Sequence, residues 1–494
     1  MQAEHDLLII GGGINGAGIA RDAAGRGLKV LLVEQGDLAG ATSGWSSKLI
    51  HGGLRYLEQY EFRLVREALQ EREVLLKLAP HIIRPIFFVL PHGKGMRPRW
   101  MIRIGMWLYD NLGGKISLPG STAVSFPHME YSAGLKTDFS AGFVYSDCKV
   151  DDARLVVLNA MSAREKGATI LTRTKAVAAV REGGVWCVTL EENGRRREVR
   201  ARGLVNASGP WVRRMLDAIK GDRIEDRIRL VKGSHIVVPK VHSQGHALIL
   251  QHEDGRVVFI IPYEGKYSLI GTTDVQVGSI EEAAAITPAE TAYLLEVANE
   301  FLAKPLTEAD VVWSYAGVRP LYDDGTADPS KVTRDYVLKV DEEKGAAPLL
   351  SIFGGKITTY RRLAEHAMEK LAPFYPGLRP PWTAGKSLPG GNVNFNAFRD
   401  ELRGKYMGLP REWVEGIARR HGSLSATVLG EARMPESLGL HFGAGLTSRE
   451  VDYMVEHEWA CTADDVLWRR SKCGLHMTPE QRAAVATYFA SRSK

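Results

Sequence analysis

The sequence has few cysteines and no long apolar run. Its four cysteines lie far apart and form neither a CxxC pair nor the spacing of a zinc site: Cys148, Cys187, Cys461 and Cys473. We therefore expect a reducing compartment with these thiols as packing residues, and no catalytic metal. No apolar run approaches the roughly 18 residues that span a bilayer, and residues 1–6 are too polar and short for a signal peptide. We expect a cytoplasmic chain.

Basic residues are only slightly more numerous than acidic ones. The formal net charge of +6 and a pI of about 8.9 favour anionic partners, which include phosphorylated metabolites, nucleic acids and lipid headgroups. The basic residues are scattered between acidic ones, and no zinc finger or RRM-like motif is present. This pattern argues against a nucleic-acid partner and leaves the other two open.

The order of apolar runs predicts an α/β protein. With 494 residues, the chain can form two or three domains. Residues 6–10 predict a strand, residues 14–27 a helix of small residues and residues 28–34 a second strand, which together make a βαβ unit. Further strands are predicted at residues 176–180, 185–190, 204–207, 234–238, 257–261 and 349–353. From Leu388 onward the sequence becomes charged and helix-favouring, so we expect a domain boundary there.

A glycine motif opens the first predicted helix. Gly11, Gly13 and Gly16 have the spacing GxGxxG, and Glu34 follows about 20 residues later, at the end of the second strand. Gly11 permits a tight turn, Gly13 lets the backbone approach a pyrophosphate, and Gly16 allows close packing of helix on strand. The helix N-terminus supplies amide donors for the phosphates, and Glu34 can accept hydrogen bonds from a ribose. The motif predicts a dinucleotide site, but it does not separate FAD from NAD.

The rest of the chain resembles a flavoprotein family. A small and polar loop at residues 41–56 is suited to lining an extended cofactor. With seven further segments, it resembles the FAD-dependent, aerobic-type glycerol-3-phosphate dehydrogenases of the glycine oxidase/D-amino-acid oxidase superfamily. The segments that carry the resemblance, in family order and spacing, are residues 11–18, 46–56, 145–148, 206–211, 232–235, 271–274, 317–320 and 354–360. Ser208 is a modest departure, because the family often has threonine there.

The resemblance implies three domains. A discontinuous Rossmann-like FAD-binding domain is expected at residues 1–80, 145–215 and 312–385. A substrate-binding domain with a mixed sheet is expected at residues 81–144 and 216–311, and a helical C-terminal domain at residues 386–494.

The resemblance also implies noncovalent FAD and the residues that bind it. These are Gly11, Gly12, Gly13, Ile14, Asn15, Gly16, Glu34, Thr42, Ser43, Ser46, Ser47, the backbone near Val177, Ala207, Gly209, Gly317, Gly354, Gly355, Lys356, Thr358 and Thr359. The residues themselves give a reason for the flavin end. Because 356–359 precede a predicted helix at 360–371, its N-terminus can face the flavin and stabilise an anionic reduced ring. Alternatively, Gly354 and Gly355 form only a turn before a core helix.

A site that oxidises a glycerol phosphate needs fixed cations for the phosphate and a base for the alcohol proton. Arg55, Arg319 and Lys356 lie in glycine-rich, apolar surroundings rather than on charged faces, and arginine forks suit phosphate oxygens. The family's matching positions line the substrate pocket, so we expect these three residues in the site, together with Tyr56. A single arginine is more often a solvated surface residue, so the assignment depends on the motifs around it.

Histidine is the natural base for the alcohol proton. His51 and His235 both lie in motif segments, and we favour His51 because it shares a short loop with Arg55 and Tyr56. A structural role for either histidine stays open. Thr272 and Thr273 contribute hydroxyls to the substrate or simply end a strand.

The predicted reaction is oxidation of sn-glycerol 3-phosphate to dihydroxyacetone phosphate, with the electrons passed to membrane quinone. An oxidase that uses oxygen, a flavin-binding regulatory protein without turnover and a flavin-dependent tRNA-modifying relative are the alternatives. The sequence leaves the oligomeric state open, a homodimer included.

A quinone reductase without a spanning helix should bind anionic lipid peripherally, on the inner face of the cell membrane. Residues 97–109 are the candidate contact, because they mix three arginines with two tryptophans and large apolar residues. The alternative is that this helix packs into the substrate-binding domain.

Overall fold

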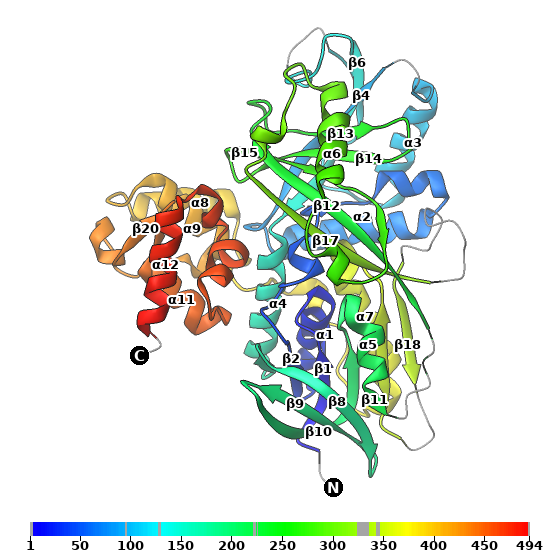
Figure 1. The fold of residues 1–494 in the computed structure, drawn as a ribbon, viewed down its shortest axis with the longest axis vertical. Helices are drawn as coiled ribbons and strands as arrows, with labels where there is room; N and C mark the ends of the chain where they lie inside the picture. The colour runs from blue at the N-terminus through cyan, green and yellow to red at the C-terminus, as the bar shows by residue number, and fades with distance from the viewer. Residues whose placement is uncertain are drawn as a thin grey trace.

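The computed structural model describes residues 3–93, 96–126, 130–220, 224, 226–323, 335–341 and 346–492. Two large sheets, here called sheet A and sheet B, lie above one another in Figure 1, and a separate group of helices near the C-terminus lies beside them. The predicted α/β class with a mixed sheet and a helical C-terminal region is confirmed. Within the described residues, no helix has the length and apolar character needed to cross a bilayer.

Sheet A is built around the predicted βαβ unit. Strands β1 (His5–Ile10) and β2 (Val30–Val33) are parallel and flank helix α1 (Ile14–Gly25), as predicted. Strand β10 (Arg195–Asn206) pairs with β1 and β19 (Leu349–Phe353) through its last residues, and β7 (Thr169–Leu171) pairs with β2. Strand β18 (Val337–Asp341) adds an antiparallel edge.

Helices cover one face of the parallel strands. Helix α1 packs against α4 (Asp152–Glu165) and α7 (Tyr360–Leu371), and α7 has the predicted bounds. The approach is close because α1 carries small residues: a Cβ atom on Gly18 would lie 2.8 Å from the Tyr360 ring. Strands β9 (Val185–Glu192), β8 (Lys175–Glu182) and β11 (Ile219–Lys220) continue sheet A from the first half of β10. Together with helix α5 (Val212–Asp217), they pack against the other face of β1 and β2.

Sheet B forms the second large layer. Its order is β17 (Trp313–Tyr322), β12 (Ile228–Pro239), β15 (Tyr267–Gly271), β14 (Val257–Tyr263), β13 (Ala247–Gln251), β4 (Ile83–His92), β6 (Ala141–Val150) and β3 (Leu49–Ile50). The short strands β16 (Val275–Val277) and β5 (Thr122–Ser125) pair with β12 and β6. Strands β3, β6 and β17 belong to this sheet, although the sequence-based boundaries place β3, β17 and residues 145–150 of β6 in the FAD-binding domain.

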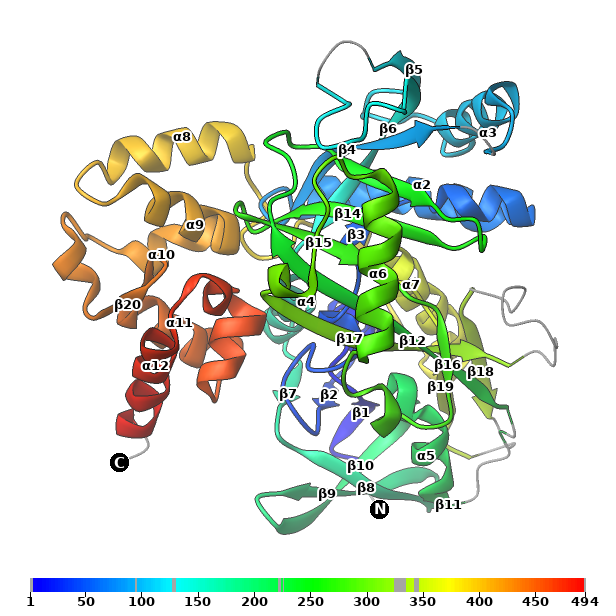
Figure 2. The same ribbon diagram turned by 45° about the horizontal axis from the view of Figure 1, so that its top comes forward.

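Alternation along the strands gives sheet B a core on each face. On β4, Phe88 packs toward helices α2 (Phe62–Leu78) and α3 (Arg99–Leu112), whereas the next residue, Val89, packs toward helix α6 (Pro288–Phe301). Figure 2 shows α6 along one side of the sheet and α2 and α3 on the other.

The C-terminal region has cores of its own. Its helices are α8 (Phe395–Lys405), α9 (Arg411–His421), α10 (Ser425–Leu429), α11 (Ser448–Glu458) and α12 (Pro479–Arg492), with a π-helical turn at Asp465–Arg470. A small hairpin of β20 (His441–Gly443) and β21 (Leu446–Thr447) completes it. It contacts the remainder mainly along α4.

Candidate active site

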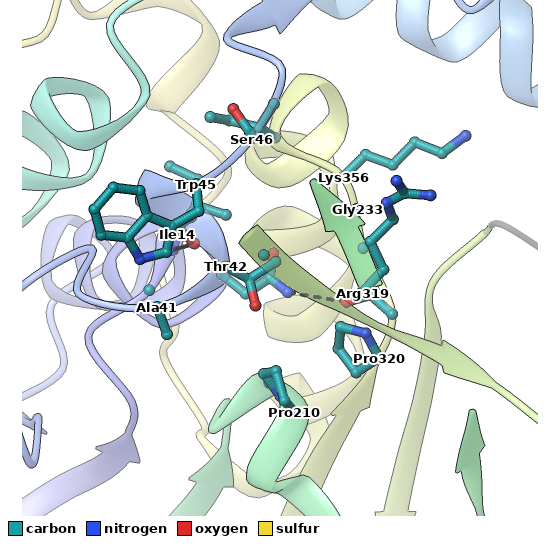
Figure 3. Close-up of a pocket in the computed structure, with 18 of the residues that line it drawn as sticks. Ile14, Ala41, Thr42, Trp45, Ser46, Pro210, Gly233, Arg319, Pro320 and Lys356 are labelled. Atoms are coloured by element: carbon teal, nitrogen blue, oxygen red, sulfur yellow. Dashed lines mark hydrogen bonds between the residues drawn. The ribbon is translucent and has the colours of Figure 1, made fainter. Parts of the chain in front are cut away.

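A cavity of about 880 Å³ runs from the carboxyl ends of the parallel strands of sheet A to sheet B. Its lining comes from the β1–α1 turn, the loop at residues 40–47, strand β8, the end of β10, strands β12, β14 and β17, and the segment that precedes α7. Figure 3 shows part of this lining. Residues from several distant parts of the sequence therefore meet in one site.

The β1–α1 turn leaves no room for side chains. Gly11 has a φ of +114°, and a Cβ atom there would lie 2.5 Å from the carbonyl oxygen of Ala207. A Cβ atom on Gly16 would lie 1.9 Å from the Gly11 carbonyl oxygen. At Gly13 the nearest atom to such a Cβ is Ser43 Oγ, at 3.1 Å, and the position faces the cavity. The fold therefore requires glycine at positions 11 and 16, whereas the missing side chain at Gly13 keeps the cavity open.

At the end of the cavity near the β1–α1 turn, the polar groups suit the adenosine diphosphate half of a dinucleotide. Backbone amides of Gly12 and Gly36 donate to the two Glu34 carboxylate oxygens at 2.6 and 2.7 Å. Burial raises the pKa of Glu34, and these two hydrogen bonds oppose that shift. Ser43 Oγ accepts a hydrogen bond from the Ile14 amide at 3.0 Å and so fixes the loop at residues 40–47 against the N-terminus of α1.

Strand β8 carries an irregularity beside the same end. The register between β8 and β9 shifts between Ala176 and Ala178, so Val177 is the extra residue of a bulge, and it lines the cavity. A bulge leaves backbone groups outside the ladder, where they can contact a ligand. Ala207 and Gly209, at the end of β10, complete this part of the lining.

The opposite end is built where α7 begins. Gly354 and Gly355 have φ values of +75° and +100°, and residues Ile357–Thr359 form a 3-10 turn that leads into α7. Asn15 Nδ2 donates to the Gly354 carbonyl at 3.2 Å, whereas Asn15 Oδ1 is buried with no hydrogen-bond partner among the described residues. A donor of a bound cofactor can satisfy that oxygen.

Two cations are fixed at this end. Arg319 donates to Asp274 Oδ1 at 2.5 Å and to Thr272 Oγ1 at 3.1 Å. A Cβ atom on Gly233 would lie 2.3 Å from Arg319 Nη2, so this glycine makes room for the guanidinium. Lys356 Nζ lies over the Tyr56 ring, 3.8 Å from its centroid. In Figure 3 the Lys356 and Arg319 side chains extend toward the same side of the cavity.

Both predicted histidines line the cavity. Burial lowers the pKa of His51, and Lys356 and Arg72 lower it further against the opposing effect of Asp147. Burial also places the pKa of His235 well below its ordinary value. His235 Nε2 lies 2.9 Å from Ser47 Oγ, and its ring stacks on Tyr315. Each imidazole is therefore neutral near pH 7, which is the protonation state that a general base has before it takes a proton.

Most residues predicted from sequence line this cavity, but four do not. Gly12, Gly16, Thr273 and Thr359 lie outside its lining. Thr273 is buried between sheet B and α6, where its hydroxyl donates to Glu290 and accepts from the Ser234 amide. The lining residues among the predicted set are Gly11, Gly13, Ile14, Asn15, Glu34, Thr42, Ser43, Ser46, Ser47, His51, Arg55, Tyr56, Val177, Ala207, Gly209, His235, Thr272, Gly317, Arg319, Gly354, Gly355, Lys356 and Thr358.

Sequence reasoning missed seven charged residues of the cavity lining: Asp37, Arg173, Lys175, Arg214, Arg256, Asp274 and Arg469. Asp274 lies in the segment 271–274, which carries part of the family resemblance. It comes beside residues 317–320 because the strands that flank it and strand β17 all pair with β12. The other six have no motif around them that marks them as site residues.

Comparison with known proteins identifies the family. The model of FAD-dependent oxidoreductases matches residues 6–361, and that of the C-terminal domain of alpha-glycerophosphate oxidase matches residues 382–491. The chain belongs to the FAD-dependent oxidoreductase family. The cofactor of this flavoenzyme is FAD, and the orphaned Asn15 oxygen, the glycine turn and Glu34 fit that group.

The flavoenzyme has relatives that match nearly their whole length. It is 52% identical over 488 residues to the aerobic glycerol-3-phosphate dehydrogenase of Escherichia coli (strain K12), covering 98% of this chain and 97% of the relative. It is 50% identical over 489 residues to the D-erythritol 1-phosphate dehydrogenase of Brucella abortus (strain 2308), with the same coverage. The solved glycerol-3-phosphate dehydrogenase from Bacillus halodurans, complexed with FAD, has a TM-score of 0.75 at 27% identity and covers 99% of this chain and 94% of its own.

The glycine turn gives the first prediction. Gly13→Glu should yield colourless protein, because the new side chain occupies the space in which the backbone approaches the pyrophosphate. The measurement is the ratio of flavin to protein absorbance after purification. Gly404→Glu is the control, because Gly404 is exposed on α8 with open space around it. Normal flavin content in Gly13→Glu would refute this role of the turn.

Proposed function

We propose that this flavoenzyme oxidises sn-glycerol 3-phosphate to dihydroxyacetone phosphate and passes the electrons to membrane quinone. The observation that carries the proposal is that Arg55, Arg319 and Lys356 line one cavity, with the Arg319 and Lys356 side chains on the same side of it. A dianionic phosphate needs such a group of cations, and the matching names of the relatives support the same substrate.

The roles of these residues follow from their surroundings. Arg319 is held by Asp274 and Thr272, so its guanidinium is oriented before substrate binds. Preorganised cations lose little free energy to reorganisation and bind the phosphate in one pose. With the phosphate fixed, the secondary alcohol lies near the neutral His51, which takes the hydroxyl proton as the carbonyl forms. FAD, when bound, supplies the acceptor for the hydride that leaves the same carbon.

A second candidate substrate has the same chemistry. The Brucella abortus relative is named for D-erythritol 1-phosphate, and its identity to this chain is nearly as high as that of the Escherichia coli dehydrogenase. Both substrates are phosphorylated polyols with a secondary alcohol. The same cationic residues can bind the phosphate of either substrate. Selection between the two substrates therefore depends on how much space the cavity offers to the carbon chain that bears the alcohols.

An anaerobic titration tests the reaction. We expect glycerol 3-phosphate to bleach the flavin absorbance fully and glycerol to leave it unchanged, since glycerol has the alcohols but no phosphate. In steady state, turnover with a soluble quinone analogue should exceed turnover with oxygen. Faster flavin reduction by D-erythritol 1-phosphate than by glycerol 3-phosphate would make the erythritol phosphate the substrate. Faster turnover with oxygen than with the quinone analogue would favour an oxidase. If neither phosphate bleaches the flavin, the proposal is wrong.

The cationic residues give a separate prediction. Arg319→Ala or Lys356→Ala should retain FAD but lower kcat/KM by about a hundredfold or more, which corresponds to losing about 3 kcal/mol of charge-assisted contact in the transition state. Arg229→Ala is the matched control, because Arg229 lies on β12, pairs with Asp323 and is outside the cavity lining. Kinetics within about threefold of the parent for both cavity variants would contradict the assignment.

The proposed quinone acceptor requires a lipid contact, and helix α3 supports one. Met106 and Tyr109 pack inward, whereas Trp100, Trp107 and Ile104 expose 63, 63 and 53% of their surface. These residues share a helical face with Arg103, which is exposed as well. Exposed tryptophans beside arginines are typical of helices that lie in a membrane interface.

The location of α3 fits access to the active site. The helix packs against the 3-10 turn Leu54–Gln59, which carries the cavity residues Arg55 and Tyr56. In Figures 1 and 2, α3 lies at the outer edge of the molecule, on the side away from the C-terminal helices. A membrane that contacts α3 would therefore lie near the substrate end of the cavity.

Flotation with anionic liposomes tests this contact. The parent should float at low salt, and Trp100→Ser/Arg103→Ser should bind at least about fivefold more weakly, because one arginine near an anionic surface contributes about 1 kcal/mol and the indole adds to it. Met434→Ser/Arg433→Ser, an equally exposed pair in the C-terminal region, should float like the parent. Equal flotation of the α3 variant excludes this helix as the contact, and a parent that stays in solution favours the oxygen-using alternative.

A further inference from the structure

Ion pairs join the C-terminal domain to the FAD-binding part of the chain. Glu458 on α11 accepts from Arg154 on α4 at 2.5 Å, and both side chains are fully buried. Arg470 donates to the two carboxylate oxygens of Asp37 at 2.6 and 2.7 Å. A third pair connects Lys472 to Asp151. Burying these charges costs desolvation free energy, which their pairing offsets, so the ion pairs favour this docked arrangement.

Two loops of the FAD-binding part, one after β2 and one after β7, form part of the rim of the cofactor cavity. Asp37 lies in the loop after β2, three residues beyond Glu34, and Arg173 lies in the loop after β7. The loops are tied to each other, because the Arg173 amide donates to the Gly36 carbonyl at 2.9 Å and the Thr174 amide to the Glu34 carbonyl at 2.8 Å. Both Asp37 and Arg173 line the cavity.

The C-terminal domain holds both loops through one turn of helix. In the π-helical turn Asp465–Arg470, Arg469 pairs with Asp37 of the first loop and with Asp465 of its own turn. Asp465 accepts from Arg173 of the second loop at 2.6 and 2.8 Å. Arg469 itself lines the cavity, although it lies more than 400 residues from the glycine turn.

The carboxylate at the centre of this cluster is permanently charged near neutral pH. Burial disfavours the ionised form of Asp465, but hydrogen bonds from the Cys461 amide and from Arg173 lower its pKa to about 2. The Thr462 amide also donates to it, at 3.0 Å. Asp465 is therefore a fixed anchor for both arginines.

We propose that the C-terminal domain is a clamp on the cofactor, in which Arg469 closes the adenosine end of the cavity and holds the loops of Asp37 and Arg173 against the adenosine diphosphate half of FAD. The proposal rests on the orientation of FAD with that half over the glycine turn. It gives this domain a task that is independent of which alcohol is oxidised.

The variant Arg469→Met tests the clamp with little risk to folding. Each partner of Arg469 keeps another cation, since Asp37 remains paired with Arg470 and Asp465 with Arg173. Loss of one charge-assisted contact should speed FAD dissociation from the holoenzyme about tenfold or more. ADP has only the half of FAD that the clamp meets, so its Kd for the apoprotein should rise by the same factor.

Two control variants separate the clamp from a general effect. Arg403→Met removes a charge from an ion pair with Glu415 that lies wholly within the C-terminal domain, and FAD and ADP binding should stay at parent values. Arg469→Lys keeps the charge and should restore part of the affinity. Because the measurements are of binding, a wrong substrate assignment leaves them unaffected.

The outcomes decide the proposal either way. FAD release and ADP affinity of Arg469→Met within about twofold of the parent would overturn it, since one lost charge-assisted contact should exceed that difference. If the unfolding midpoint of the Arg469→Met apoprotein falls, Arg173→Met replaces it, because Arg173 is partly exposed and belongs to the same cluster. Weaker ADP binding in that variant supports the clamp, and unchanged ADP binding rejects it.

Discussion

The close approach of the β1–α1 turn to the end of β10 is the constraint on which the site depends. Without side chains at Gly11 and Gly16, the helix N-terminus comes within backbone contact of Ala207. That contact directs the first amides of α1 toward the cavity and places Glu34 at the end of the neighbouring strand. A Cβ atom at either glycine would collide with a carbonyl group, and backbone cannot move aside as a flexible side chain can.

The two ends of the cavity have different electrostatic character, and different parts of the chain set it. At the adenosine end, acidic groups are paired with arginines or backbone amides, so the local charge is nearly balanced. At the substrate end, Arg319 and Lys356 are held by Asp274 and by the Tyr56 ring. The proposed phosphate dianion suits these cations. They also help to keep the neighbouring histidines neutral, because burial among cations disfavours a further positive charge.

The exposed face of α3 and the C-terminal domain occupy separate sides of the molecule (Figures 1 and 2). One contacts the turn that bears the substrate residues, and the other contacts the loops at the opposite end of the cavity. The proposed lipid contact and the proposed hold on the cofactor can therefore be tested by separate substitutions.

Local sequence determined the βαβ unit, helix α7 and a dinucleotide site, because glycine spacing and apolar periodicity act within one or two elements. The choice of FAD came from the resemblance to a flavoprotein family, and the comparisons confirm it. The segments around His51, Arg319 and Lys356 also carried enough signal to place these residues in one cavity. Tertiary structure alone decided which strands belong to sheet B, which face of α3 is exposed, and that Arg469 meets Asp37. The contact of Arg469 with Asp37 joins residues more than 400 positions apart. An arginine also has the same local sequence signal whether it faces solvent or a cofactor cavity.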